Sequence, residues 1–202
     1  MNSKKQLAVT LSRLQNFERP SVKLEQYPTD SEIAAEIIWF AYQNGDISEK
    51  TIADLGCGTG ILGIGCMFFS PEKVYFVDID DKPLKKLEEN LQLQEMKNYE
   101  IIESDVMKFN ETVDTVFQNP PFGVKTEHAD KLFLEQAFTF SKVVYSFHKL
   151  NTKNFVEAIA KDNNFKITHF WKFDFPLKRS QHYHKKNIQK IDVGCWRLEK
   201  LL

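Results

Sequence analysis

A proline-rich corner, Asn119-Pro120-Pro121-Phe122 in "VFQNPPFG", is the feature of this sequence that points most specifically to chemistry. Proline donates no backbone hydrogen bond and restricts the residue before it, so the corner ends the apolar run "DTVFQ". The Asn119 side-chain oxygen and the Pro120 carbonyl are two acceptors that the prolines hold in fixed directions. Two such acceptors can orient both N–H groups of an exocyclic amine on a nucleic-acid base and favour the pyramidal nitrogen that attacks an electrophile.

The aromatic residue of the corner completes this hypothesis. The Phe122 ring offers a face on which a flipped-out or single-stranded base can stack. Asn119 cannot act as a general base, so the proton of the amine is expected to leave to water after transfer. The alternative is a rigid loop with a buried phenylalanine.

A glycine-rich turn, "GCGTG" at 56–60, follows the apolar run "TIADL" and opens an expected helix. The pattern "GTGILG" matches the dinucleotide fingerprint, although a plain strand-to-helix turn has the same signature. Asp54 stands two residues before Gly56, where a carboxylate would repel a pyrophosphate but suits a ligand with a cationic end. S-adenosylmethionine carries a sulfonium and an α-amino group and has no phosphate, and the glycines would let the backbone approach it.

Two further acids end the next two expected strands. Asp78 ends "VDID" and is predicted to accept hydrogen bonds from ribose hydroxyls, while Asp105 ends "ESD" and is a candidate acceptor for an adenine amino group. The alternative for Asp78 is a surface acid that caps the following helix, a role that Asp80 or Asp81 fits better. Ligands of parallel sheets bind outside the carboxyl ends of the strands, so acids at three consecutive ends predict a cofactor site.

Strand and helix patterns alternate along the chain and position these residues. After residue 50 the alternation occurs five times and is followed by two long strands, which predicts an α/β fold with a mostly parallel seven-stranded sheet, helices on both faces and a C-terminal antiparallel pair. Residues 4–16 predict one helix, and a capping box of Thr29 and Glu32 predicts the start of a second that ends near Gln43. We expect one domain over 1–202, with 1–45 as a helical segment covering the cofactor and 50–202 as the core.

The motifs "DLGCGTG", "VDID", "ESD" and "NPPF" in this order resemble the amino-group branch of the Rossmann-like, class I S-adenosylmethionine-dependent methyltransferases. Over nearly the whole chain, with "FERPSVKLEQYPT", "VVYSFHK" and "HYHKK", the sequence is similar to the archaeal and eukaryotic family of small-subunit ribosomal RNA adenine-N6 methyltransferases. The resemblance implies methyl transfer to adenine N6, with S-adenosylhomocysteine as the other product. The preference for adenine rests on the resemblance, because the corner itself does not distinguish adenine from guanine or cytosine.

The resemblance also implies a set of site residues. The catalytic motif is Asn119, Pro120, Pro121 and Phe122, and the cofactor contacts are Gln26, Tyr27, Thr29, Gly56, Thr59, Ile61, Asp78 and Asp105. Asp54, Gly58 and Gly60 join the predicted cofactor site on the argument from the glycine turn given above. Thr59 is expected to make its contact through the backbone.

A basic and aromatic stretch, "LKRSQHYHKK", lies between the last two expected strands. Charged side chains with interleaved aromatics suit single-stranded RNA, so we predict RNA contacts from Lys178, Arg179, His182, Tyr183, Lys185 and Lys186. The net charge of −1 means that such binding would be local. The alternative is a solvated hairpin loop. His148, which ends another expected strand, either lines the pocket or has a structural role.

Composition and cysteine usage set the class of protein. Hydrophobic residues make up 42% and charged residues 27% of the 202 residues, as in a globular domain. The three cysteines form no CxxC pair, which predicts reduced thiols, no metal site and a cytoplasmic location. No apolar run reaches the roughly 18 residues of a membrane helix, and the N-terminus lacks the apolar core of a secretory signal.

Eukaryotic members of the family that this chain resembles work with a small zinc-binding activator protein at a sheet edge. The expected strand "YEIIES", with Ile101 and Ile102, would be the matching edge. Two other functions stay open: methylation of another RNA base amine or of a protein glutamine, and binding of the cofactor and RNA without catalysis.

Overall fold

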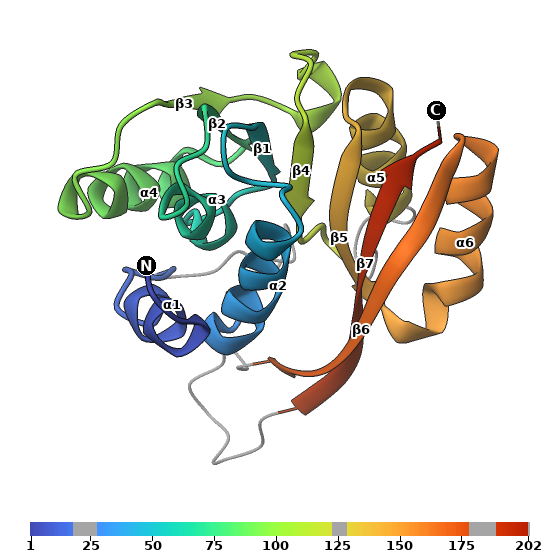
Figure 1. The fold of residues 1–202 in the computed structure, drawn as a ribbon, viewed down its shortest axis with the longest axis horizontal. Coiled ribbons are helices and arrows are strands. Elements are labelled where there is room, and N and C mark those ends of the chain that lie inside the picture. The colour runs from blue at the N-terminus through green and yellow to red at the C-terminus, as the bar shows by residue number, and fades with distance from the viewer. Residues whose placement is uncertain (18–27, 123–128, 178–188, 202) are drawn as a thin grey trace.

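The computed structural model of the chain describes residues 1–17, 28–122, 129–177 and 189–201. Seven strands form one sheet in the order β3-β2-β1-β4-β5-β7-β6 (Figure 1). They are β1 (Thr51–Leu55), β2 (Lys73–Asp78), β3 (Tyr99–Glu103), β4 (Thr115–Gln118), β5 (Val143–Lys149), β6 (Phe165–Leu177) and β7 (Gln189–Lys200). The strands β1 to β5 pair in parallel, and β7 runs antiparallel to both β5 and β6. The predicted sheet and its antiparallel C-terminal pair are confirmed.

Helices cover both faces of the sheet (Figure 1). One face carries α2 (Ser31–Gln43), α3 (Ile61–Met67) and α4 (Asp81–Leu93), with α1 (Lys4–Leu11) packed against α2 and α3. The other face carries α5 (Ala129–Phe140) and α6 (Lys153–Asp162). Two 3-10 turns, η1 (Val106–Lys108) and η2 (Leu150–Thr152), complete the described elements.

The alternation of side chains along the central strands divides the core in two. Ile52 and Phe117 lie in the cluster with α1 to α4, whereas Ala53 and Val116 lie in the cluster with α5 and α6. Successive residues of a strand point to opposite faces, and a sheet buried on both faces needs apolar residues on both. This explains why the central strands read as continuous apolar runs in the sequence.

The order of the strands determines where a ligand can bind. From β1 the chain moves outward through β2 to β3 and then crosses back to β4 on the opposite side of β1. The carboxyl ends of β1 and β4 therefore border a topological switch point, the place where open parallel sheets bind their ligands. Asp54 and Gln118 lie at these two ends, directly beside the glycine turn and the proline corner.

Two local predictions at the N-terminal end are wrong. The first helix ends at Leu11 instead of continuing to residue 16. The second helix is capped by Asp30, whose carboxylate oxygen accepts hydrogen bonds from the backbone N–H groups of Glu32 at 2.9 Å and Ile33 at 3.3 Å. Asp caps a helix at least as well as Thr, and here the Thr29 hydroxyl bonds to another side chain instead.

The strands β3 and β6 form the two edges of the sheet, and the placement of β3 at an edge agrees with the prediction.

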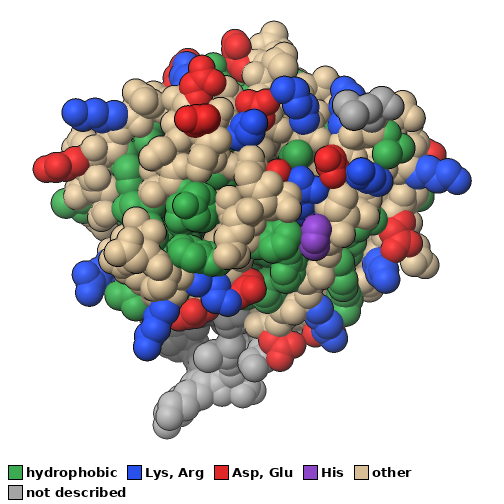
Figure 2. All heavy atoms as spheres, in the orientation of Figure 1, with side chains coloured by type: hydrophobic (Ala, Val, Ile, Leu, Met, Phe, Trp, Pro, Cys, Tyr) green, Lys and Arg blue, Asp and Glu red, His purple; other side chains and the backbone are tan. Residues whose placement is uncertain are grey.

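Figure 2 shows Lys, Arg, Asp and Glu side chains interspersed over one face of the molecule, without a large region of one sign. Within the described part of the chain, every helix is too short or too polar to span a lipid bilayer.

Candidate active site

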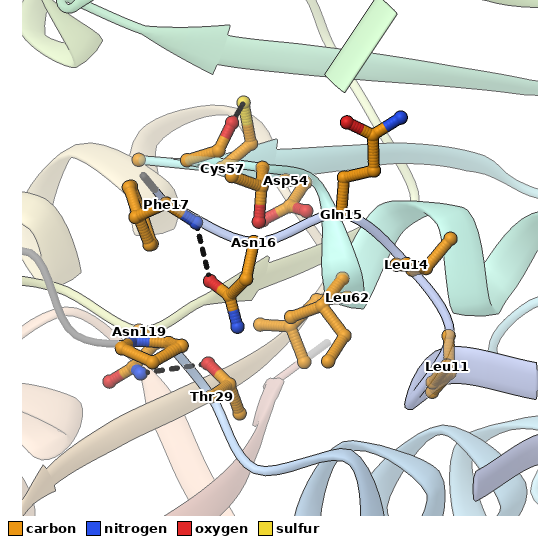
Figure 3. Close-up of a pocket in the computed structure, with 15 residues that line it drawn as sticks. Leu11, Leu14, Gln15, Asn16, Phe17, Thr29, Asp54, Cys57, Leu62 and Asn119 are labelled. Carbon is orange, nitrogen blue, oxygen red and sulfur yellow. Dashed lines mark hydrogen bonds between the residues drawn. The ribbon is translucent and has the colours of Figure 1, made fainter. Parts of the chain in front are cut away.

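A cavity opens at the switch point, between the glycine turn, the proline corner and the N-terminal segment (Figure 3). The described residues that line it are Leu11, Leu14, Gln15, Asn16, Phe17, Pro28, Thr29, Asp54, Gly56, Cys57, Gly58, Thr59, Ile61, Leu62 and Asn119. Asp54 is the only charged residue among them.

The glycine turn has a backbone that other residues would adopt only under strain. Gly58 has a φ of 55° and Gly60 a φ of 86°, both in the left-handed region. A Cβ on Gly60 would lie 2.3 Å from Leu87 Cδ1, and a Cβ on Gly58 would lie 2.8 Å from Phe17 Cζ. The glycines thus allow α4 and the N-terminal segment to approach the turn closely.

Two buried carboxylates hold this turn in shape. Asp54 Oδ2 accepts from the Gly63 N–H at 2.8 Å, and Asp78 Oδ2 accepts from the Gly58 N–H at 2.8 Å. The second Asp78 oxygen accepts from the Asp80 N–H at 3.0 Å. Burial raises the pKa of Asp54 to about 7 and raises the pKa of Asp78 above its ordinary value, against the opposing effect of these N–H donors.

Asn119 meets Thr29 at the edge of the cavity (Figure 3). Asn119 Nδ2 donates to Thr29 Oγ1 at 3.0 Å, and the Thr29 side chain comes from the connector that precedes α2. The other end of the amide, Oδ1, is buried, and no described residue donates a hydrogen bond to it. A buried acceptor without a donor costs roughly 1–3 kcal/mol, so this oxygen is available to a donor on a ligand.

The remaining residues of the corner are packed against the protein. Pro120 is buried, and the Phe122 ring is only 7% exposed. The ring lies edge-on to Phe175, with centroids 6.4 Å apart and planes at 85°. Stacking of a base on Phe122 would require the ring to leave this packing, so that role stays a prediction.

A chain of buried polar side chains lies beneath the corner on the α5 face of the sheet. Gln118 Nε2 donates to Ser146 Oγ at 2.9 Å, and Ser146 Oγ lies 2.7 Å from His148 Nε2. His148 Nδ1 in turn lies 3.5 Å from Asp130 Oδ2. Although burial opposes it, the contact with His148 leaves the pKa of Asp130 below its usual value. His148 is fully buried and is absent from the cavity lining, which favours its structural role.

The N-terminal segment after α1 forms a wall of the cavity, through residues that were not among the predicted cofactor contacts. Asn90, a fully buried residue of α4, accepts from the Gln15 N–H at 2.8 Å and donates to the Gln15 carbonyl at 3.0 Å. The same Asn90 Nδ2 donates to the Thr59 carbonyl at 3.2 Å. One side chain therefore ties the N-terminal segment to the glycine turn. Its signal in the sequence is a polar residue at an apolar position of the α4 pattern.

The structure thus brings some of the predicted site residues together and leaves others apart. Thr29, Asp54, Gly56, Gly58, Thr59, Ile61 and Asn119 line the cavity, whereas Gly60, Asp78 and Asp105 do not. Asp105 caps η1 through the Met107 N–H at 3.0 Å. Gln26, Tyr27 and the predicted RNA contacts Lys178, Arg179, His182, Tyr183, Lys185 and Lys186 lie outside the described residues. Among the described residues, no three His, Cys, Asp or Glu side chains gather in a way that could hold a metal ion.

Comparison with known proteins places this geometry in a family. Residues 33–142 match the family model described as "Methyltransferase small domain". The rRNA N(6)-adenosine-methyltransferase METTL5 of Danio rerio is 33% identical, with 94% of this chain and 95% of that protein covered. The corresponding enzyme of Caenorhabditis elegans is also 33% identical, with 95% of each chain covered.

A solved structure shows the same fold over the whole chain. The crystal structure of a proposed RNA methyltransferase from Pyrococcus horikoshii has a TM-score of 0.91 and 38% identity, and the match covers 100% of both chains. The protein described here therefore belongs to the methyltransferase family that includes the rRNA N(6)-adenosine-methyltransferases of these animals.

Proposed function

We propose that this protein transfers a methyl group from S-adenosylmethionine to the exocyclic N6 of an adenine in small-subunit ribosomal RNA. The observation that carries the proposal is the buried Asn119 Oδ1, which lacks a described donor at the rim of the cavity. An amine that enters the cavity supplies the missing N–H. The names of the relatives support ribosomal RNA as the substrate and adenine N6 as the position.

The cavity suits S-adenosylmethionine better than a dinucleotide. No described lining residue is Lys or Arg, so the described wall offers no cation to a pyrophosphate, and the Asp54 carboxylate fits a cationic ligand instead. Because the glycines of the turn carry no side chains, they do not themselves screen the backbone from a ligand. Thr29, Asp54, Gly56, Gly58, Thr59 and Ile61 would hold the cofactor, with Gln26, Tyr27, Asp78 and Asp105 as further contacts. When bound, S-adenosylmethionine supplies a methyl group on a positively charged sulfur and becomes S-adenosylhomocysteine.

The residues of this chain then orient the acceptor. Asn119 Oδ1 and the Pro120 carbonyl accept the two N–H bonds of the amine and direct its lone pair toward the methyl group. The amine nitrogen would form the new bond to the methyl carbon that S-adenosylmethionine supplies, and the sulfur would keep the electrons of the broken bond. Asn119 takes up no proton, so the amine proton leaves to water. Phe122 provides the stacking surface for the base once its ring leaves Phe175.

RNA is proposed to bind along the stretch that contains Lys178, Arg179, His182, Tyr183, Lys185 and Lys186, where cationic and aromatic side chains alternate.

We assign residues 1–45 to a segment that covers the cofactor and 50–202 to the core of one domain. The thiols of Cys57, Cys66 and Cys195 are free and buried, which supports a cytoplasmic location.

A small zinc-binding activator is proposed to pair with β3. In the described sheet β3 bonds to β2 alone, so its other side offers unpaired backbone groups to a partner strand. Activity of the purified protein measured with and without such a partner tests this proposal. Full activity of the isolated chain would contradict it.

The substrate is tested by incubating purified protein, alone and with the partner, with radiolabelled S-adenosylmethionine and small-subunit RNA. Digestion of the RNA and mass spectrometry of its nucleosides should reveal N6-methyladenosine. Label in another base amine or in a protein glutamine would assign a different methyl acceptor. Tight cofactor binding without label in any RNA would overturn the proposed activity.

A further inference from the structure

The orientation of the Asn119 amide decides whether the proposed reaction can occur. An amide presents an acceptor at one end and two donors at the other. A base amine also presents N–H donors, so only the Oδ1 end of Asn119 can orient it. The fold must therefore provide a partner that keeps the Nδ2 end away from the amine.

We propose that Thr29 is the positioning residue that holds the Asn119 amide with Oδ1 facing the substrate; this inference rests on the function proposed above. Thr29 Oγ1 lies 3.0 Å from Asn119 Nδ2, and the Thr29 side chain is only 7% exposed. Water therefore competes little for the bond, which satisfies Nδ2 and leaves the buried Oδ1 without a described donor. The N-terminal connector thus takes part in orienting the amine, in addition to the cofactor contact expected of it.

The start of α2 explains why the Thr29 hydroxyl is available. A threonine at this point would ordinarily cap the helix, but Asp30 takes that role with hydrogen bonds to the N–H groups of Glu32 and Ile33. Those two bonds fix the backbone directly beside Thr29. The hydroxyl is thereby positioned by a rigid helix start and points to the amide across 90 positions of sequence.

Thr29 also lines the cavity, so the alternative is that it only contacts the cofactor and does not orient Asn119. The two roles affect different kinetic quantities. Loss of a cofactor contact weakens the binding of S-adenosylmethionine. Loss of amide positioning lowers kcat at saturating cofactor and leaves that binding intact.

The test compares Thr29→Val, which removes the hydroxyl at nearly constant shape, with Thr29→Ser, which keeps it. Thr139→Val on the exposed side of α5 is the matched control, since Thr139 bonds only to the Gln136 carbonyl of its own helix. Calorimetry gives the Kd for S-adenosylmethionine, and methyl transfer to RNA gives kcat. The side-chain NH₂ signals of Asn119 in a nitrogen–proton correlation spectrum, assigned by their loss in Asn119→Ala, report on the hydrogen bond itself.

Thr29→Val should lower kcat at saturating cofactor by roughly 10- to 100-fold, the range expected when a positioned polar group is lost, whatever its effect on the Kd. It should also shift the Asn119 signals. Thr29→Ser should retain both the kcat and the signals of the wild type. Wild-type kcat in Thr29→Val, or a weaker Kd with unchanged kcat, would overturn the inference. Absence of transfer by the wild type would instead contradict the proposed function.

Discussion

At the scale of single residues, the chemistry of this protein centres on polar atoms that the fold buries beside an open cavity. Asn119 Oδ1 lacks a described donor, and Asp54 places a carboxyl group where water is largely excluded. The sequence predicts both residues because their motifs are local. It does not predict the partner Thr29 of Asn119, because that hydrogen bond joins positions 90 residues apart.

Asp54 should make the stability of the ligand-free protein depend on pH. Burial raises its pKa from 3.8 to about 7, so the folded state favours the protonated form. Below the unfolded pKa of 3.8, Asp54 is protonated in both states and does not oppose folding. The free energy of unfolding then falls as the pH rises from 3.8 through the folded pKa of about 7, because ionising the buried group is unfavourable. Urea unfolding of wild type and Asp54→Asn at about pH 5 and about pH 8 should show the wild type losing stability relative to the variant as the pH increases.

Asp162→Asn at the exposed end of α6 provides the control for this measurement, because it removes a carboxylate that water solvates. Its stability relative to the wild type should be the same at both pH values. If Asp54→Asn behaves like this control, the burial of Asp54 does not perturb its ionisation.

At the scale of elements, hydrogen bonds of buried side chains connect the N-terminal segment and the sheet to the site. Asn90 connects the N-terminal segment, and the Gln118–Ser146–His148 contacts connect the strands β4 and β5. The helix α1 ends at Leu11, and the chain that follows is held to the glycine turn by Asn90. Periodicity predicts the existence of the two N-terminal helices α1 and α2, since apolar spacing is a local property. It overestimates the length of the first, because the bonds that Asn90 makes to Gln15 span 75 positions.

Asn90→Ala should loosen this arrangement and weaken cofactor binding. The substitution leaves main-chain groups of Gln15 and Thr59 without their partner, which costs roughly 1–3 kcal/mol of the free energy of unfolding. The Kd for S-adenosylmethionine, measured by calorimetry, should rise because Gln15 and Thr59 both line the cavity. Glu88→Ala on the exposed face of the same helix should change neither quantity. An unchanged Kd in Asn90→Ala would show that the hydrogen bonds of Asn90 to the N-terminal segment do not contribute to cofactor binding.

The side-chain contacts that link Gln118, Ser146, His148 and Asp130 should stabilise the end of β4. We do not expect Ser146 to act as a nucleophile. Ser146 and His148 are fully buried and do not line the cavity, so the Ser-His-Asp combination is not accessible to a substrate there. Ser146→Ala leaves Gln118 Nε2 and His148 Nε2 without their shared partner and should reduce the free energy of unfolding by roughly 1–3 kcal/mol.

Urea unfolding measures this effect, with Ser12→Ala in the exposed turn after α1 as the control. Equal stabilities of the two variants would show that the Gln118–Ser146–His148 contacts contribute nothing to folding.

At the scale of the whole molecule, the alternation of strands and helices predicts the fold because each change of hydrophobic period is visible locally. Parallel pairing then brings the carboxyl ends of β1 and β4 to one side, and with them the glycine turn and the proline corner. The burial of Phe122 was left as an alternative, and its partner Phe175 could not be predicted, because the two residues are far apart in the sequence and meet only through tertiary packing. The site was therefore predictable in its location and residue types, and less so in its contacts.

The central claim is that the Asn119 amide orients the amine that receives the methyl group. Its most direct test is the single-turnover rate of methyl transfer to small-subunit RNA by Asn119→Ala, with Asn110→Ala in an exposed connector as the control. The rate should fall by roughly 100- to 1,000-fold, as when other preorganised polar groups are removed, while the Kd for S-adenosylmethionine stays unchanged. An Asn119→Ala rate within about threefold of the Asn110→Ala rate would contradict the claim. A threefold change corresponds to less than about 1 kcal/mol, which is too little for a group that orients the amine.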